Sequence, residues 1–283
     1  MLIKARIFDL NTPLGHKVSV TEFPSINSND IVIILSATGV LQKYYAKFSQ
    51  FLQSKNHTVF TFDYSGIGRS KKKPLTQFNI TLSNWATNDI ETVLSYIKKQ
   101  YPLKKINCIA HSLGGQLLGL TPSSKTLNNI ILVASQTNHY SFWNGLNKIR
   151  IFFNWFIIFP FFTTFFKYFP SKHFIKMENL PKDVAREFSK WSQQKEYYFN
   201  LKTNNELYHH QIYSNLVGYS CTNDKFAPEK AVDWMVYKFN NANITRKHLI
   251  PSNYNVKKIG HFGFFRTHFK DSIWQEFLTD LQK

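Results

Sequence analysis

The chain has 283 residues, of which 43% are hydrophobic and 18% are charged, with only 11 Gly and 10 Pro. This composition excludes a disordered, collagen-like or low-complexity protein and suits one large α/β domain that carries an insertion. Lys and Arg exceed Asp and Glu by 18, which raises nucleic acid or an anionic membrane as partners. The excess is spread along the chain without a nucleic-acid-binding motif, so we expect no specific nucleic-acid partner.

The chain has two cysteines, Cys108 and Cys221, and its first residues do not resemble a signal peptide. Both features disfavour a disulfide framework or a secreted scaffold, and two cysteines are too few for a zinc cluster. We therefore expect a cytoplasmic protein.

Strand and helix signals alternate from residue 1 to residue 138. Hydrophobic spacing predicts helices around 45–52, 90–101 and 112–120. Runs of β-branched and aliphatic residues predict buried strands at 31–35, 58–62, 106–110 and 130–134. This alternation predicts a mostly parallel, doubly wound sheet. Segments 4–8 and 17–21 predict an antiparallel hairpin at its edge.

The alternation stops after the sixth expected strand, and we predict a helical cap over residues 139–210. It would divide the core into a first part, 1–138, and a second part, 211–283. In the second part, strand and helix signals resume at 216–220, 228–239, 244–249 and 272–281.

The expected cap is rich in phenylalanine. The segment 151–169 holds nine Phe, one Trp and one Tyr. Asn154, Pro160 and Lys167 interrupt it, so we expect the apolar run to fall short of the ~20 residues that span a bilayer. We expect these rings to line a substrate cleft or face outward, where the cap could contact a membrane peripherally. Packing of the rings against the sheet is the alternative.

The sharpest local signal is Ala110-His111-Ser112-Leu113-Gly114, between an expected buried strand and an expected helix. A nucleophilic serine on a strained strand-to-helix turn requires small residues two positions before and after it, so that strand and helix can approach closely. We therefore predict Ser112 as a nucleophile at a nucleophile elbow.

A nucleophilic serine needs a base, and the base needs a carboxylate that orients it. Asp224 follows an expected strand at the start of a loop, which suits the acid. His261 lies in a loop bracketed by glycines after the last expected strand, which suits the base. Other histidines lie too early, within a strand or in the cap: His111, His139, His209, His210 and His248.

An oxyanion hole requires two backbone N–H groups. One is expected from Leu113, the residue after the nucleophile. The other is expected from the small-residue loop after the strand at 31–35, where we favour Val40 and keep Gly39 and Thr38 as alternatives.

Six segments together resemble the α/β-hydrolase superfamily, and more narrowly a bacterial group of predicted hydrolases near the serine aminopeptidase and lysophospholipase-like hydrolases. They are Ala37–Val40, Asp63–Ser70, His111–Gln116, Tyr168–Pro170, Thr222–Pro228 and Ile259–Arg266. This sequence departs from the group's pattern at Ala110, where the group has Gly, and at Asn223, where it has Asp.

The resemblance implies an α/β-hydrolase fold with a lid-like cap, no metal and no cofactor, and a serine esterase that uses Ser112, Asp224 and His261. We expect a small-molecule ester or related acyl substrate with an apolar acyl group. Two alternatives remain open: an acyltransferase with the same triad, and a non-catalytic protein that binds membrane surfaces. The motifs specify neither the physiological substrate nor the oligomeric state.

Overall fold

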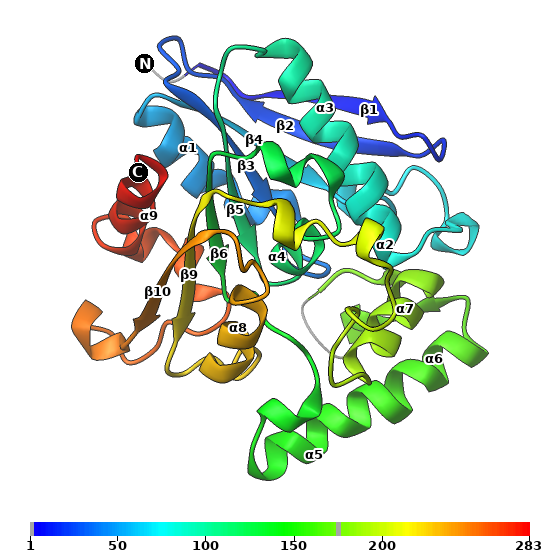
Figure 1. The fold of residues 1–283 in the computed structure, drawn as a ribbon. Coiled ribbons are helices and arrows are strands. Elements are labelled where there is room, and N and C mark those ends of the chain that lie inside the picture. The colour runs from blue at the N-terminus through cyan, green and yellow to red at the C-terminus, as the bar shows by residue number, and fades with distance from the viewer. Residues whose placement is uncertain (1–2, 174–176) are drawn as a thin grey trace.

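An eight-stranded sheet crosses the molecule in the order β1-β2-β4-β3-β5-β6-β9-β10 (Figure 1). The computed structural model describes residues 3–173 and 177–283. The pairs β1/β2 and β2/β4 are antiparallel, and all other neighbours are parallel. This confirms the predicted sheet with an antiparallel hairpin at its edge. The strands are β1 (Arg6–Asn11), β2 (Lys17–Phe23), β3 (Asp30–Leu35), β4 (His57–Asp63), β5 (Ile106–His111), β6 (Asn129–Val133), β9 (Asn215–Cys221) and β10 (Asn243–Leu249).

Helices cover both faces of the sheet, with α1 and α9 on one side and α3, α4 and α8 on the other (Figure 1). Phe48 of α1 and Trp274 of α9 meet edge to face with ring centroids 5.2 Å apart. The helices are α1 (Ala46–Ser54), α2 (Leu82–Asn84), α3 (Glu91–Gln100), α4 (Leu113–Leu118), α8 (Glu229–Val236) and α9 (Ile273–Leu281). A π-helical segment over Trp85–Ile90, which the sequence did not predict, joins α2 to α3.

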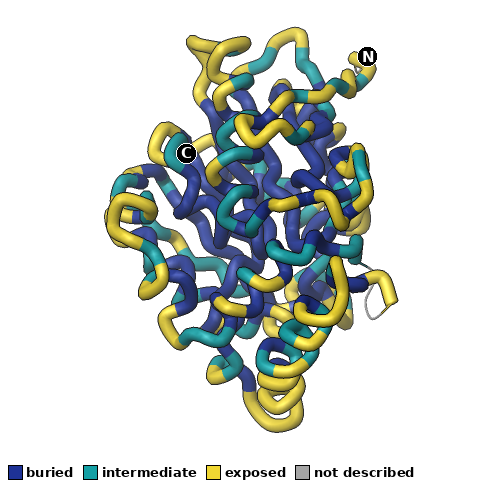
Figure 2. The backbone as a smooth tube through the Cα atoms, turned by 90° about the vertical axis from the view of Figure 1, so that its right-hand side faces the viewer, coloured by how far each residue is buried: buried dark blue, intermediate teal, exposed yellow. Residues whose placement is uncertain are grey.

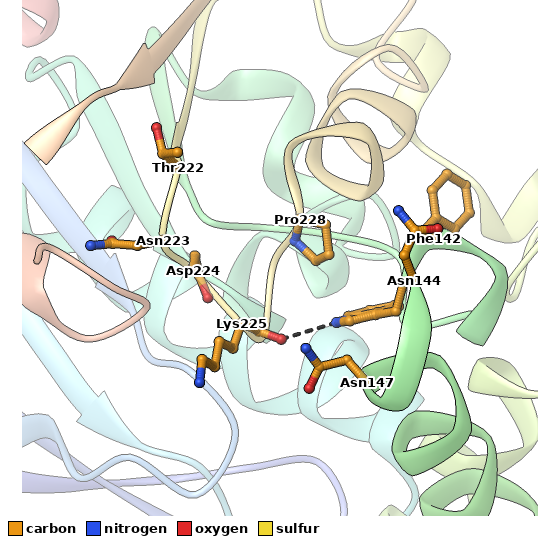
Figure 3. Close-up of a pocket in the computed structure, with 9 residues that line it drawn as sticks. Phe142, Asn144, Asn147, Thr222, Asn223, Asp224, Lys225 and Pro228 are labelled. Carbon is orange, nitrogen blue, oxygen red and sulfur yellow. Dashed lines mark hydrogen bonds between the residues drawn. The ribbon is translucent and has the colours of Figure 1, made fainter.

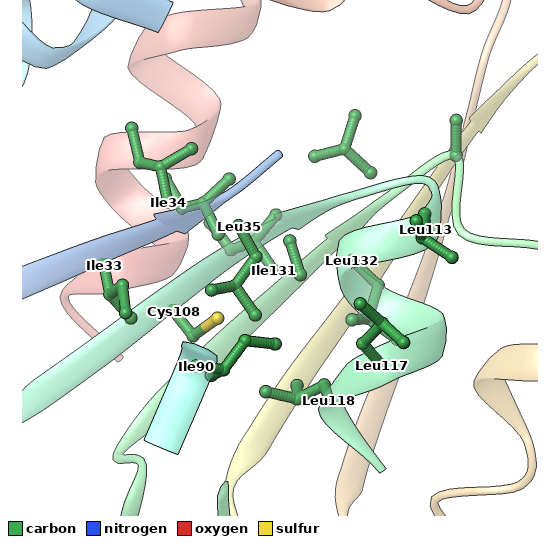
Figure 4. Close-up of a cluster of buried hydrophobic side chains, with 14 of the residues drawn as sticks. Ile33, Ile34, Leu35, Ile90, Cys108, Leu113, Leu117, Leu118, Ile131 and Leu132 are labelled. Carbon is green, nitrogen blue, oxygen red and sulfur yellow. The ribbon is translucent and has the colours of Figure 1, made fainter. Parts of the chain in front are cut away.

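The central strands are buried on both faces, as their continuous apolar runs require. Figure 4 shows this core beneath α4, where Leu117 and Leu118 pack with Ile131 and Leu132 of β6 and with Cys108 of β5. The close packing fixes the start of α4, and therefore the position of Ser112, relative to the sheet.

The residues predicted as the cap lie within the connection between β6 and β9, at the lower right of Figure 1. This connection contains α5 (Gly145–Phe153), a π-helical turn (Asn154–Ile158), α6 (Phe159–Phe165) and α7 (Lys182–Ser192). The short strands β7 (Tyr168–Phe169) and β8 (Leu180–Pro181) pair beside α7. Whether 139–210 is an independent folding unit stays a prediction.

The Phe-rich segment forms one continuous helix, Gly145–Phe165, rather than an interrupted run. Its 21 residues are long and apolar enough to cross a bilayer by length and composition, and 17% of its most apolar window is buried. The expectation that Asn154 and Pro160 interrupt the segment is therefore wrong. Pro160 lacks a backbone N–H, and the π-helical turn just before it accommodates the missing hydrogen bond.

Candidate active site

Ser112 lies at the turn between β5 and α4 with φ = 52° and ψ = −114°. Positive φ is strained for any residue with a Cβ, and such strain concentrates at functional sites. The tight turn also explains the glycine two residues later, because a Cβ on Gly114 would lie 2.6 Å from the carbonyl oxygen of Leu35. The structure thus gives Ser112 the geometry expected of a nucleophile elbow.

Asp224 and His261 come together from two loops, although 37 residues separate them. The Nδ1 atom of His261 lies 2.8 Å from Oδ2 of Asp224, and both side chains are almost fully buried. The other carboxylate oxygen of Asp224, Oδ1, accepts the backbone N–H groups of Phe226 (2.8 Å) and Ala227 (3.0 Å). These bonds fix the carboxylate so that it faces the imidazole.

Asn223 ties the loop that carries Asp224 to the loop that carries His261. Its Oδ1 accepts the N–H of Gly260 at 3.0 Å, and its Nδ2 donates to the carbonyl of Lys257 at 3.2 Å. An aspartate could make only the first of these bonds, because an ionised carboxylate has no donor. The departure from the resembled pattern at Asn223 therefore has a structural reason that the sequence alone did not reveal.

The start of the cap is fixed to the same loop by the indole N–H of Trp143, which donates to the carbonyl of Lys225 at 2.9 Å (Figure 3). A polar pocket of about 360 Å³ lies here, lined by cap residues such as Asn147 and by residues 222–225. Neither Ser112 nor His261 lines it. The pocket therefore does not contain the reacting groups.

Ser112 and His261 instead line one cavity of about 330 Å³ between the core and the cap. Thr38 joins them from the loop after β3. The polar side chains of the cavity include Gln136, Asn138, Arg150 and Asn154. Its apolar wall comes largely from the cap and consists of Trp143, Ile151, Trp155, Phe159, Phe169, Met177, Leu180, Phe188, Phe226 and Phe262.

The backbone groups near Ser112 require one correction. Leu113 is the first residue of α4, so its N–H has no acceptor within the helix, as expected of an oxyanion donor. Val40, in contrast, donates its N–H to Ala37 at 3.1 Å and lines a different, open pocket. The choice of Val40 is therefore wrong. Within the described residues the N–H of Thr38 has no partner, which favours that alternative.

A buried hydrogen-bond chain behind the site joins three loops. The N–H of Ala37 donates to the hydroxyl of Tyr45 (3.0 Å), which donates to Nδ1 of His111 (2.8 Å), and Nε2 of His111 donates to the carbonyl of His261 (2.9 Å). Burial and the neighbouring His261 lower the pKa of His111 well below its ordinary value. A neutral His111 can both accept and donate, as this chain requires.

Two further motifs have structural roles. Asp63 accepts the N–H groups of Gln42 (2.7 Å) and Arg69 (2.9 Å) and so orders the loop after β4. Gln116 of α4 accepts the hydroxyl of Tyr197 through Oε1 and that of Tyr198 through its carbonyl, both at 2.7 Å. These bonds join the cap to the elbow helix.

Metal-ligand geometry was sought among His, Cys, Asp and Glu. Over residues 3–173 and 177–283, no group of three or more such side chains could hold a metal ion. Both cysteines are buried and free in this part of the chain.

Comparisons with known proteins agree with this fold. Residues 31–156 match a family model described as alpha/beta hydrolase fold. No curated protein matches the chain. The chain thus belongs to the α/β-hydrolase superfamily, as its motifs indicate.

Several solved structures resemble the chain over nearly its whole length. One, a complex of DcsB with its substrate analogue, has 11% identity and a TM-score of 0.67, with 99% of each chain covered. The Pf2001 esterase of Pyrococcus furiosus has 15% identity and a TM-score of 0.63, with 99% of this chain and 91% of that chain covered. Est1E of Butyrivibrio proteoclasticus, solved with ferulic acid bound, has 13% identity and a TM-score of 0.61, with 98% and 100% covered. At these identities the likeness supports the fold.

Proposed function

We propose that this chain is a serine hydrolase of carboxylic esters with apolar acyl groups. The observation that carries the proposal is the shared cavity: Ser112 at a strained elbow and His261, oriented by Asp224, line one largely apolar space. The esterases among the structural relatives agree with it. The motifs further suggest the bacterial group of predicted hydrolases near the lysophospholipase-like enzymes.

In the proposed reaction, Oγ of Ser112 attacks the ester carbonyl while its proton passes to Nε2 of His261. The N–H groups of Leu113 and Thr38 hold the negative charge that develops on the carbonyl oxygen. The intermediate collapses, the C–O bond to the leaving group breaks, and His261 returns the proton to the departing alcohol. Water, deprotonated by His261, then attacks the acyl-enzyme and releases the acid, which regenerates Ser112.

Hydrolysis of p-nitrophenyl esters tests this proposal. The wild-type protein should hydrolyse them, and Ser112→Ala should lose nearly all turnover while it remains folded by circular dichroism. Ser124→Ala is the matched control, because Ser124 is also buried but does not line the cavity, and its hydroxyl has no partner among the described residues. Equal turnover by Ser112→Ala and the wild type would refute the proposal.

The same assay distinguishes an acyltransferase. An alcohol or thiol acceptor added to the reaction should compete poorly with water if the proposal is correct. Predominant formation of the new ester or thioester would assign the triad to acyl transfer instead.

A further inference from the structure

A row of large apolar side chains runs along the outer face of the helix Gly145–Phe165. Its members follow one another at three- or four-residue steps, which places them on one face of a helix. Each is half or more exposed: Leu146, Ile149, Phe153, Ile157, Phe161 and Phe165. We call this row the apolar stripe. We propose that the apolar stripe docks the protein onto an anionic lipid surface, with the helix axis in the plane of the interface.

The stripe is exposed over its whole length. The helix forms the outer edge of the cap, away from the sheet (Figure 1), and long exposed stretches of the backbone lie at that end of the molecule (Figure 2). Phe152 and Phe166 are also exposed and widen the stripe. A contiguous apolar surface of this kind marks an interaction site in a soluble protein.

The charges beside the stripe favour anionic lipid over a second copy of the chain. No Asp or Glu occurs between Glu91 and Glu178. Lys148, Arg150 and Lys167 are exposed on the helix or directly after it. Pairing of two identical helices would bring like charges together. Anionic headgroups neutralise them, and an amphipathic helix with basic residues is the usual interfacial anchor.

The opposite face of the helix is attached to the cap, which favours a position at the surface over a membrane span. Trp155 is buried, and its carbonyl accepts hydrogen bonds from Ser189 (2.7 Å) and Gln193 (2.6 Å) of α7. Thr163 is buried too, and its carbonyl accepts a bond from Arg186 of α7 at 3.3 Å. A span would break these contacts along the helix, whereas insertion of the apolar stripe alone preserves them.

The stripe is also separate from the cavity. The helix residues that line the cavity are Arg150, Ile151, Asn154, Trp155 and Phe159, none of which belongs to the stripe. Docking and hydrolysis can therefore be tested independently, and Ser112→Ala should bind lipid as the wild type does.

An environment-sensitive dye on a single cysteine reports insertion directly. Both native cysteines are buried, and burial raises the pKa of each thiol, so an added exposed cysteine should react selectively. Dye on Ile157→Cys should shift to shorter emission wavelength with vesicles of phosphatidylglycerol and phosphatidylcholine, and much less with phosphatidylcholine alone. Dye on Leu103→Cys, at a fully exposed site away from the helix, should not shift. An unshifted Ile157→Cys would overturn the proposal.

Vesicle flotation provides the second measurement. The triple variant Phe153→Ser, Phe161→Ser and Phe165→Ser should lose at least tenfold in partition coefficient yet keep wild-type turnover of a soluble short-chain ester. The control replaces three other exposed apolar residues by serine: Ile26, Leu103 and Tyr213. Concentrated salt should release the wild type, because it screens surface charge.

Three outcomes would overturn the proposal. The triple variant could float as the wild type does. The bound protein could resist both salt and alkaline washing, as an integral protein does. The wild type could fail to float and instead form a dimer in solution that the triple variant dissociates, which would assign the stripe to a second copy.

Discussion

Asp224 accepts three hydrogen bonds, and their directions determine what a substitution does. Oδ1 is held by two backbone N–H groups, and Oδ2 faces Nδ1 of His261. In Asp224→Asn, the amide oxygen would stay with the two N–H groups, so the amide nitrogen would face the imidazole. His261 would then carry its proton on Nε2 and could not accept one from Ser112.

We therefore predict that Asp224→Asn lowers kcat on the order of 10⁴-fold, the loss caused by the same change in a protease triad. Steady-state hydrolysis of a p-nitrophenyl ester measures this loss. Asp233→Asn, at a half-exposed residue paired with Arg246, is the matched control. A loss below tenfold would place the orienting acid elsewhere.

The chain from Ala37 through Tyr45 and His111 to the carbonyl of His261 acts on position rather than on substrate. Its members come from the loop after β3, the turn before α1, the end of β5 and the histidine loop. This chain fixes the distance between the candidate oxyanion loop and the candidate base. His111, excluded as the base by its place in the sequence, thus has a structural function beside Ser112.

The elbow is the element most sensitive to added volume. A Cβ on Gly114 would meet the backbone of Leu35, which cannot move without disturbing β3. We predict that Gly114→Ala lowers the free energy of unfolding by about 1–3 kcal/mol, the range typical of overpacking. Urea unfolding should detect it. Gly263→Ala, whose Cβ would lie 3.3 Å from a side-chain methyl of Ile259, should cost less. Equal costs would contradict this packing argument.

The cap helix offers a comparison between its two faces. Phe159 lines the cavity, whereas Phe161, two residues on, is exposed. Each methylene buried in an apolar pocket is worth up to about 0.8 kcal/mol, so kcat/KM of the wild type should rise from acetate to hexanoate esters. Phe159→Ala should flatten this series, and Phe161→Ala should leave it unchanged. A flat wild-type series would indicate a small or polar acyl group.

At the scale of the whole molecule, two buried groups give opposite contributions to the pH dependence of stability. Burial raises the pKa of Asp89 to about 7 and lowers the pKa of His209 to about 3. Asp89 therefore contributes stability that is lost as the pH rises from its ordinary range towards 7. His209 contributes stability that is lost as the pH falls from about 6.5 towards 3.

We predict that Asp89→Asn makes the free energy of unfolding rise more steeply with pH between about pH 5 and 7, by up to ~1.4 kcal/mol per pH unit relative to the wild type. His209→Asn should change the slope in the opposite direction, and so serves as the internal control. Urea unfolding at a series of pH values measures both. Parallel curves for all three proteins would show that neither group titrates as its burial implies.

The sequence predicted the features that depend on local pattern. Buried strands show as apolar runs, and the elbow around Ser112 shows as small residues at fixed spacing. Features that depend on distant contacts were missed. The N–H of Val40 is occupied by a turn, and the contacts of His111 lie 66 and 150 residues away. The cap helix continues through Pro160 because a π-helical turn precedes it, which no apolar spacing indicates.

The central claim, that Ser112 is the nucleophile, is tested most directly by labelling with a fluorophosphonate and mapping the adduct by peptide mass spectrometry. The wild type and Ser124→Ala should each carry one adduct, located on Ser112, because only a serine activated by a neighbouring base reacts readily. Ser112→Ala should carry none. An adduct on another residue of the wild type, or an adduct that persists in Ser112→Ala, would contradict the account.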